Sequence, residues 1–377
     1  TDLYANPLPF KSGQIVARYN KDSSILRVEP LRFDFEKMIL HGEADIHVGS
    51  TPRDVNATFK LSDLPVEQFS QIWPEQAGKN ARDWILENIH KGMLDEAVLN
   101  LAMTVPDNDV TAATLKDVHG TLKISNAEMT CWKPLPNIQK LNAAGTFNEK
   151  GFDIQIASGE QGEIKIKPSH VVITGLDEEN QIITLDANIA APANALLEVL
   201  DRPPMGYAKK MNIKPKETSG NVDGLLHMSF PLLKELLFDQ IVLKADAKVT
   251  DGAMQNVAGL IDVSKGNVAL LVDKDGLSFK GDAALNGVPS TIDWMERFAA
   301  AAPDTLLSKA SIKGNANAED IKKFGINIGM SSSQAFPVDV TYERGAERSK
   351  LAISGDAAAA RLQLSDLFYV KAAGAPF

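Results

Sequence analysis

Apolar and polar residues alternate along most of this chain with a period of two. In residues 55–61, valine, alanine, phenylalanine and leucine occupy every second position, with polar residues between them. Residues 99–105, 183–189 and 243–249 repeat the pattern. Because successive side chains of a β-strand point to opposite faces, each segment predicts a strand with one apolar and one polar face.

Short turn signals separate these strands. They are residues 148–151 (NEKG), 159–162 (GEQG), 264–267 (SKGN) and 273–276 (DKDG). Turns this short join antiparallel neighbours, and the chain holds about twenty strand candidates. We therefore predict a mainly β fold, a long antiparallel sheet, curved and twisted because an open sheet of this size cannot stay flat.

Helical patches lie between the groups of strands. We expect them at residues 64–73, 79–91, 192–200, 231–238, 292–300 and 318–324. The patch at 79–91 has the clearest helical period, with Ala81, Trp84 and Ile85 on one face, so Trp84 is predicted to pack in the core. His90 is expected at the C-terminus of this helix, where a cation is favoured.

A segment rich in proline and lysine, residues 202–216, is the predicted boundary between two halves. The first unit, residues 1–201, carries the helical insert at about 64–92, and the second unit is residues 217–377. The connecting segment itself is expected to be an exposed loop.

Composition narrows the functional classes. The 377 residues carry a formal net charge of -10 with no basic stripe, so we expect no nucleic-acid partner. A lone cysteine, Cys131, excludes an internal disulfide. No stretch approaches the ~20 apolar residues of a membrane-spanning helix, and the first residues do not resemble a signal peptide. Either the protein is soluble or an anchor has been removed, and because the first residues look like mid-domain sequence, we expect a fragment of a longer chain.

The sequence offers no catalytic or metal-binding pattern. His41 and His47 would lie roughly 20 Å apart along one strand, too far to share a metal ion. Residues 273–276 lack the later oxygen ligands of a calcium loop. No phosphate-binding loop, zinc-helix motif or nucleophile elbow occurs. We predict no catalytic residues, no metal and no cofactor, and hence a protein that is not an enzyme.

Several segments resemble one family, the AsmA-like proteins related to YhdP and TamB of Gram-negative bacteria. The most specific is LSDLPVEQFSQIWPEQAGKNARDWILENIHKGML at residues 61–94, preceded by YANPLPFKSGQIVARYNKDSSILRVEPL at 4–31. The segment SGNVDGLLHMSFPLLKEL at 219–236 adds to the resemblance. Two further segments, LNGVPSTIDWMERF at 285–298 and AAAARLQLSDLFYVKAAGAPF at 357–377, resemble the family more loosely.

The resemblance implies a repetitive β-groove and a location in the periplasm, anchored to the inner membrane. It also implies transport of phospholipid between the inner and outer membranes, with acyl chains as the bound partner. Envelope protein partners are expected if exposed sheet edges and the 202–216 loop serve to recruit them. Trp73 and Trp294, in two helical patches, would then either cap the sheet or contact a lipid headgroup.

We predict that the apolar faces of the strands line the groove. The candidate lining residues are Val55, Ala57, Phe59, Leu99, Leu101, Met103, Ile154, Ile156, Ile183, Leu185, Leu243, Val268, Leu270, Leu277 and Phe279. The same alternation also describes a closed sandwich core, which would make the chain a structural or interaction module of the envelope without lipid. A third alternative, an envelope hydrolase or glycan-binding enzyme, would need a polar cleft with a titratable pair.

Overall fold

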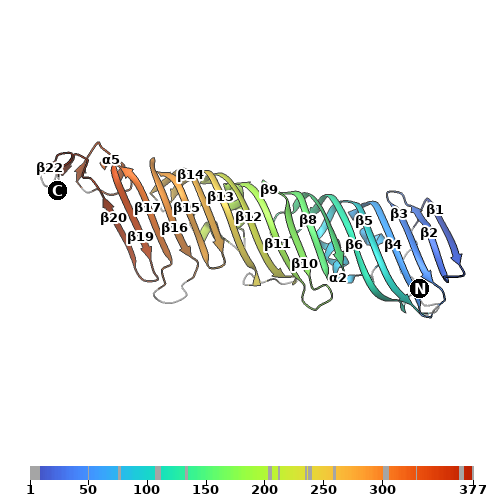
Figure 1. Ribbon diagram of the computed structural model, residues 1–377. Helices are drawn as coiled ribbons and strands as arrows, with labels where there is room; N and C mark the ends of the chain where they lie inside the picture. Colours follow the sequence, from blue (N-terminus) through green and yellow to red (C-terminus); the bar gives the residue numbers. More distant parts are fainter. Residues whose placement is uncertain are drawn as a thin grey trace. The chain divides into compact units, whose positions relative to one another are not determined.

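The structure, a computed structural model, describes residues 9–49, 51–74, 78–106, 112–131, 135–202, 206–210, 213–233, 236, 240–257, 260–299, 305–327, 329–364 and 369–375. Within these ranges, 19 strands belong to one sheet and three short strands to another. Consecutive strands lie side by side in Figure 1, and their pairings are antiparallel. The predicted mainly β, antiparallel fold with short helices is confirmed.

The chain divides into two compact units, and each is described by itself. Unit 1 is Thr1–Ala187 together with Ser229–Ile241. Its strands are β1 (Ser12–Asn20), β2 (Ile25–Asp34), β3 (Ile39–His47), β4 (Arg53–Pro65), β5 (Ile89–Val105), β6 (Thr114–Met129), β7 (Ile138–Asn148), β8 (Gly151–Gln161), β9 (Ile164–Ile166), β10 (Ser169–Thr174) and the first part of β11 (Ile182–Pro192). Its helices are the 3-10 turn η1 (Val66–Gln68), α1 (Phe69–Ile72) and α2 (Lys79–Asn88).

Unit 2 is Asn188–Met228 together with Val242–Phe377. Its strands are most of β12 (Thr218–Pro231), β13 (Val242–Val257), β14 (Ile261–Asp273), β15 (Gly276–Leu285), β16 (Val288–Arg297), β17 (Ser308–Ala316), β18 (Met330–Ser331), β19 (Phe336–Arg344), β20 (Ser349–Gly355), β21 (Leu362–Leu364) and β22 (Tyr369–Lys371). Its helices are α3 (Ala193–Leu200), α4 (Tyr207–Lys210), the 3-10 turn η3 (Pro215–Glu217) and α5 (Ala318–Lys322).

The helical insert of unit 1 packs on one end of its sheet. Leu64 and Val66 are each 2 % exposed and Phe69 is 7 % exposed. Around them pack apolar residues of β4, β5, β6 and α2, including Leu94, Ile124 and Ile85. Burying such side chains is worth roughly 1.5–3 kcal/mol each, so this end of the sheet has a closed core.

A second closed core lies at the small sheet of unit 2, which pairs β18 with β21 and β21 with β22. Phe336 and Leu362 are buried there. Lys371 is 1 % exposed, and its Nζ donates hydrogen bonds to the carbonyls of Ala357 and Ala358 at 3.0 and 2.8 Å. A buried ammonium is tolerated when it is hydrogen-bonded in this way.

Bulges interrupt the large sheet in both units, at residues with left-handed backbone. Asn126 has φ +50° in β6 and Lys140 has φ +50° in β7, while Asp251 and Lys265 have φ +51° and +52° in β13 and β14. The ladder register shifts at these points. A bulge bends its strand and increases its twist, so the large sheet bends at these positions in each unit.

Some predicted elements need correction. Residues 292–300, predicted helical, fall mostly in strand β16, because pairing with β15 and β17 on both sides overrides a local pattern compatible with either structure. The predicted turn at 264–267 lies inside β14, where Lys265 forms a bulge. Helix α2 ends at Asn88, so His90 lies in β5 and bonds Thr130 Oγ1 at 2.7 Å.

Other predicted elements are confirmed. Helices α3 and α5 occupy the predicted patches at 192–200 and 318–324. The turn at 148–151 forms, with Asn148 Oδ1 accepting hydrogen bonds from the backbone of Lys150 and Gly151. Half of the predicted 231–238 patch, residues 234, 235, 237 and 238, lies outside the described residues. Pro231 ends strand β12, and residues 232–233 are not helical.

Candidate functional site

The predicted apolar positions of unit 1 fall on one face of its sheet. Ala57 is paired with Leu101, Ile154 with Val171, and Val171 with Leu185. Directly paired residues of antiparallel strands project to the same side, so these rows run on from strand to strand. We call this surface the apolar face of unit 1. Its predicted members are Val55, Ala57, Phe59, Leu99, Leu101, Met103, Ile154, Ile156, Ile183 and Leu185.

Glycines opposite aromatic residues shape this face. Phe59 is paired with Gly42 and Phe147 with Gly120. A Cβ added at Gly42 would lie 3.0 Å from the Phe59 ring, and one at Gly120 would lie 2.5 Å from the Phe147 ring. Each phenylalanine ring therefore lies across the glycine opposite it, a cross-strand pairing in which the ring covers the glycine backbone.

The corresponding face of unit 2 is also assembled by register. Leu270 of β14 is paired with Phe279 of β15, and Phe279 with Trp294 of β16. Val268 lies one row further along, opposite Gly281. We call this surface the apolar face of unit 2. Its predicted members are Leu243, Val268, Leu270, Leu277 and Phe279.

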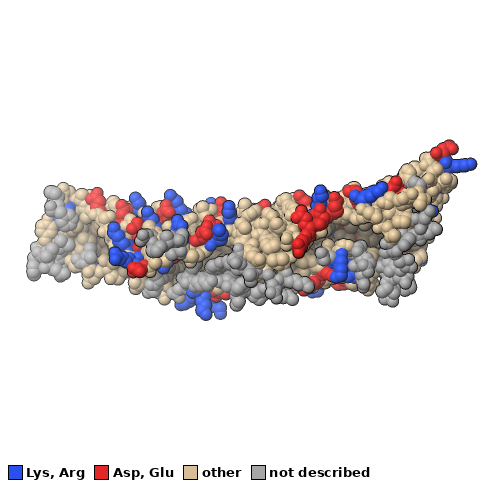
Figure 2. All heavy atoms as spheres, turned by 90° about the horizontal axis from the view of Figure 1, so that it is seen from below, with Lys and Arg blue, Asp and Glu red and all other residues tan. Residues whose placement is uncertain are grey.

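Burial separates these faces from a closed core. Of the 15 predicted lining residues, Ala57 alone is buried, and the other 14 are partly exposed. By contrast, Leu64, beneath the helical insert, is 2 % exposed. In Figure 2, surface without charged side chains is hollowed in places between groups of charged ones. The predicted residues are therefore brought together on two half-exposed faces, and their role as a lipid lining stays a prediction.

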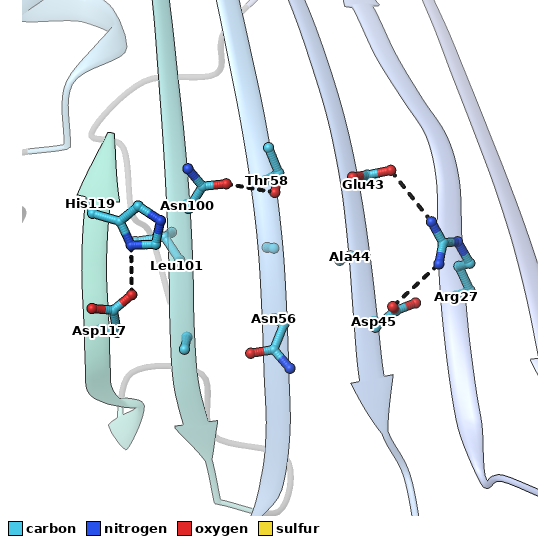
Figure 3. Close-up of a pocket in the computed structure, with 12 residues that line it drawn as sticks. Arg27, Glu43, Ala44, Asp45, Asn56, Thr58, Asn100, Leu101, Asp117 and His119 are labelled. Atoms are coloured by element: carbon cyan, nitrogen blue, oxygen red, sulfur yellow. Dashed lines mark hydrogen bonds and ion pairs between the residues drawn. The ribbon is translucent and has the colours of Figure 1, made fainter. Parts of the chain in front are cut away.

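The opposite face of unit 1 is polar and is shown in Figure 3. A depression of about 260 Å³ lies over β2 to β6. Arg27 reaches Glu43 and Asp45 at 3.5 and 3.4 Å. Further polar pairs join Thr58 to Asn100 at 2.9 Å and Asp117 to His119 at 2.7 Å.

Charge pairing dominates the chemistry of this polar face. The hydrogen bond to Glu29 and the charge of Asp45 raise the pKa of Arg27, and the hydrogen bond from Lys116 lowers the pKa of Asp54. Exposed pairs of this kind add little to stability. Among the described residues, no group of three or more His, Cys, Asp or Glu side chains could hold a metal ion.

An aromatic row crosses the apolar face of unit 2. The rings of Phe279 and Trp294 are stacked, with centroids 5.9 Å apart and planes 10° from parallel. The Trp294 and Tyr342 centroids lie 6.2 Å apart. Ala310, 2 % exposed, is paired with both Trp294 and Tyr342, and its small side chain leaves room for the two rings.

A polar row lies beside the aromatic row, at the ends of β16, β17 and β19. Ser308 is paired with Glu296 on one side and Arg344 on the other. The Arg344 guanidinium forms an ion pair with one oxygen of Glu296, and Trp294 Nε1 donates to the other at 3.4 Å. Ser308 is 1 % exposed, and its Oγ has no hydrogen-bond partner among the residues that the structure describes. A buried unpaired hydroxyl costs roughly 1–3 kcal/mol.

Sequence reasoning missed this cluster. Trp294 was expected in a helix, so its position on the apolar face of unit 2 was not predicted. The signal that identifies the partner strand is the alternation in residues 338–344, where valine, valine, tyrosine and arginine occupy every second position. The apolar period runs to Tyr342 and ends in the charged Arg344.

The other three tryptophans do not lie on the apolar faces as far as the structure describes them. Trp84 was expected in the core but is 37 % exposed, because Ile85 and Leu86 supply the buried side of α2 instead. Trp73 is partly buried beside Arg82, whose Nε donates to the Trp73 carbonyl at 3.1 Å. Trp132 lies outside the described residues.

Together these features define a class: an antiparallel β-sheet protein, made of successive strands, whose two units each have a half-exposed apolar face. None of the described helices has the length and hydropathy needed to cross a bilayer. The chain belongs to the YhdP family, because the family model described as "YhdP protein" matches residues 1–337.

One curated relative extends this result. The chain is 20% identical over 270 residues to the "Intermembrane phospholipid transporter YhdP" of Escherichia coli (strain K12). The match covers 68% of this chain and 21% of that protein, so the chain spans about a fifth of its relative's length. No solved structure matches the chain.

Proposed function

We propose that the apolar faces of the two units shield phospholipid acyl chains during transport between the inner and outer membranes. The observation that carries this proposal is the partial exposure of 14 of the 15 lining residues, in register on their faces. In a closed core, a second layer would bury such residues. A half-exposed apolar surface is instead suited to an apolar ligand.

The energy of lipid transfer explains why such a face is needed. Each exposed methylene costs about 0.8 kcal/mol in water, so a sixteen-carbon chain costs roughly 12 kcal/mol. Contact with Leu101, Ile154 or Phe279 removes part of that cost, while the charged face keeps the sheet in water. The headgroup would remain at the open edge.

The place of the chain in the cell follows from the same proposal. It would form a periplasmic part of a protein anchored in the inner membrane through a segment outside residues 1–377. Family membership and the intermembrane transport named for its relative support this location. No catalytic step is part of the proposed function, and other envelope proteins remain predicted partners.

Native mass spectrometry with lipid extraction tests the proposal. The protein is purified from a Gram-negative envelope beside a Leu101→Asp, Leu185→Asp double variant. A charge on the apolar face should remove bound phospholipid, because an acyl chain cannot solvate a carboxylate. The matched control is a Thr121→Asp, Gln155→Asp variant, which adds the same two charges at exposed positions of the polar face.

The proposal predicts phospholipid on the parent and on the control, and none on the double variant when circular dichroism shows that it is folded. Absence of phospholipid from the parent would contradict it and favour the closed-core interaction module. Equal loss from the control would show that net charge, and not the apolar face, determines binding.

A further inference from the structure

The polar row of Glu296, Ser308 and Arg344 is unexplained by acyl-chain binding alone. It places a carboxylate and a guanidinium on the apolar face of unit 2, in register with the buried Ser308 between them. The Glu296 side chain is 21% exposed and that of Arg344 is 42% exposed. Ion pairs on the polar face of the same strands, such as Lys280 with Asp293, are far more exposed, at 73% and 59%.

Ser308 indicates a ligand. Its Oγ has no partner among the described residues, although it lies between two charged neighbours that pair with each other. Buried hydroxyls in folded proteins are normally hydrogen-bonded, so the unpaired Ser308 hydroxyl is available to a group that binds there. Once Arg344 turned toward an incoming anion, the Ser308 hydroxyl could donate to the same anion.

We propose that this row binds the headgroup of a zwitterionic phospholipid, and this inference rests on the proposed lipid function. The phosphate accepts hydrogen bonds from the Arg344 guanidinium and the Ser308 hydroxyl, and the headgroup ammonium donates to the Glu296 carboxylate. A guanidinium suits phosphate because its donors match two oxygens at once. The site holds one cation and one anion, so a ligand with one of each exchanges partners with both.

The same arrangement disfavours an anionic headgroup. A headgroup with a phosphate and no ammonium would separate Arg344 from Glu296 and leave the carboxylate without a cation in a half-buried position. An unpaired charge in such a position is a common source of specificity. We therefore expect discrimination between phosphatidylethanolamine and phosphatidylglycerol.

The aromatic row continues from this site into the face. Trp294 and Tyr342 are two residues before Glu296 and Arg344, which separates the two rows by roughly 7 Å along the strands. That spacing leaves room for glycerol between the phosphate and the start of the acyl chains. The chains would then lie on the rings of Trp294 and Phe279.

A lipid competition experiment tests the inference. The full chain is loaded from an equimolar mixture of phosphatidylethanolamine and phosphatidylglycerol with identical acyl chains, and the bound lipids are measured by mass spectrometry. The parent should enrich phosphatidylethanolamine roughly tenfold, as one hydrogen bond to a charged group can provide. Glu296→Gln should abolish the enrichment, and Arg344→Gln should lower total bound phospholipid roughly tenfold.

Ser308→Ala separates binding from folding. It removes a buried hydroxyl that has no partner, so its Tm should equal or exceed that of the parent, while bound phospholipid falls roughly fivefold. A purely structural serine would not show this combination. If Arg344→Gln fails to fold, Arg344→Lys replaces it in the experiment, because lysine keeps the positive charge and loses the bidentate contact with phosphate. The matched control is Lys280→Gln with Asp293→Asn, which should change neither lipid ratio nor amount.

The outcomes distinguish this inference from the function on which it rests. Lipid bound without headgroup preference, or a preference that the control also loses, would overturn the headgroup site and leave the acyl-chain function intact. A parent that binds no lipid would overturn both. Glycerophosphoethanolamine, which has the same charges and no acyl chains, should not displace lipid, and displacement at equal concentration would overturn the link to the aromatic row.

Discussion

The side-chain carbonyl of Asn142 accepts a hydrogen bond from the backbone N–H of Asn126, on the neighbouring strand, at 3.1 Å. Asn126 is a bulge residue with φ +50°, and Asn142 also donates to the carbonyl of Lys140, a second bulge residue. One asparagine thus holds two bulges. Unit 2 repeats the arrangement, with Asn267 bonded to the backbone of Asp251 and Lys265.

Removing this bridge should destabilise the bend. Asn142→Leu would leave the two backbone groups without their partner and should lower the free energy of unfolding by about 1–3 kcal/mol. Asn126→Gly, at the same bulge, should be nearly neutral because glycine adopts positive φ without strain. Urea unfolding measures both, and equal effects from the two variants would contradict the assignment.

Ala310 should tolerate no larger side chain, because it lies between Trp294 and Tyr342. Ala310→Leu would push the rings apart and should cost about 1–3 kcal/mol. Urea unfolding followed by tryptophan fluorescence measures this cost. Lys309→Leu, at the exposed neighbouring position, is the control and should change stability by less than about 0.5 kcal/mol. A neutral Ala310→Leu would show that the rings are not packed over this alanine.

Truncations distinguish the half-exposed face from the closed core. Leu64→Ala removes a side chain that is 2 % exposed and should cost about 2–5 kcal/mol. Leu101→Ala, on the partly exposed apolar face, should cost roughly half as much, because folding removes less of the apolar area of this side chain from water. Chemical unfolding without lipid gives both values. Equal costs would mean that a second layer covers Leu101.

Acid should weaken the capping box of helix α5. Asp320 accepts hydrogen bonds from Lys323 Nζ at 2.8 Å and from the backbone of Asn317 at 3.2 Å, and these contacts lower its pKa. Because the folded state has the lower pKa, this stabilisation is present at neutral pH and is lost as the pH falls below about 4.

Asp320→Asn tests that pH dependence. It should reduce the free energy of unfolding by about 0.5–1 kcal/mol near neutral pH. This lies at the lower end of the range for helix caps, because solvent screens the ion pair. The deficit at about pH 3 should be smaller than at neutral pH, because the parent progressively loses the same stabilisation as the pH falls below about 4. Urea titrations at both pH values measure it, with Glu319→Gln as a control on the same turn. A deficit that persists in acid would contradict the mechanism.

The strands and their apolar sides could be predicted from the sequence because they depend on parity alone. In residues 55–61 and 99–105, alternation indicates which side chains share a face, and the observed register joins them as expected. Parity is lost where a bulge occurs. Lys265 looked like part of a turn because the serine, glycine and asparagine around it favour turns, yet pairing with β15 keeps it within β14 as a bulge.

The polar row of Glu296, Ser308 and Arg344 could not be predicted from the sequence. Glu296, Ser308 and Arg344 come from three strands, and only pairing across β17 brings them together. Trp294 also lies in a segment whose apolar spacing suits a helix as well as a strand. Long-range pairing decides between them, and a local pattern does not contain that information.

The most direct test of lipid shielding is photo-crosslinking at single positions. A benzophenone side chain is placed at Leu101 or Leu270 and, in matched proteins, at the next residue on the opposite face, Asn100 or Ala269. After irradiation with phospholipid, mass spectrometry identifies adducts. The account predicts lipid adducts at Leu101 and Leu270 and none at Asn100 and Ala269. Adducts at all four positions, or at none, would contradict it.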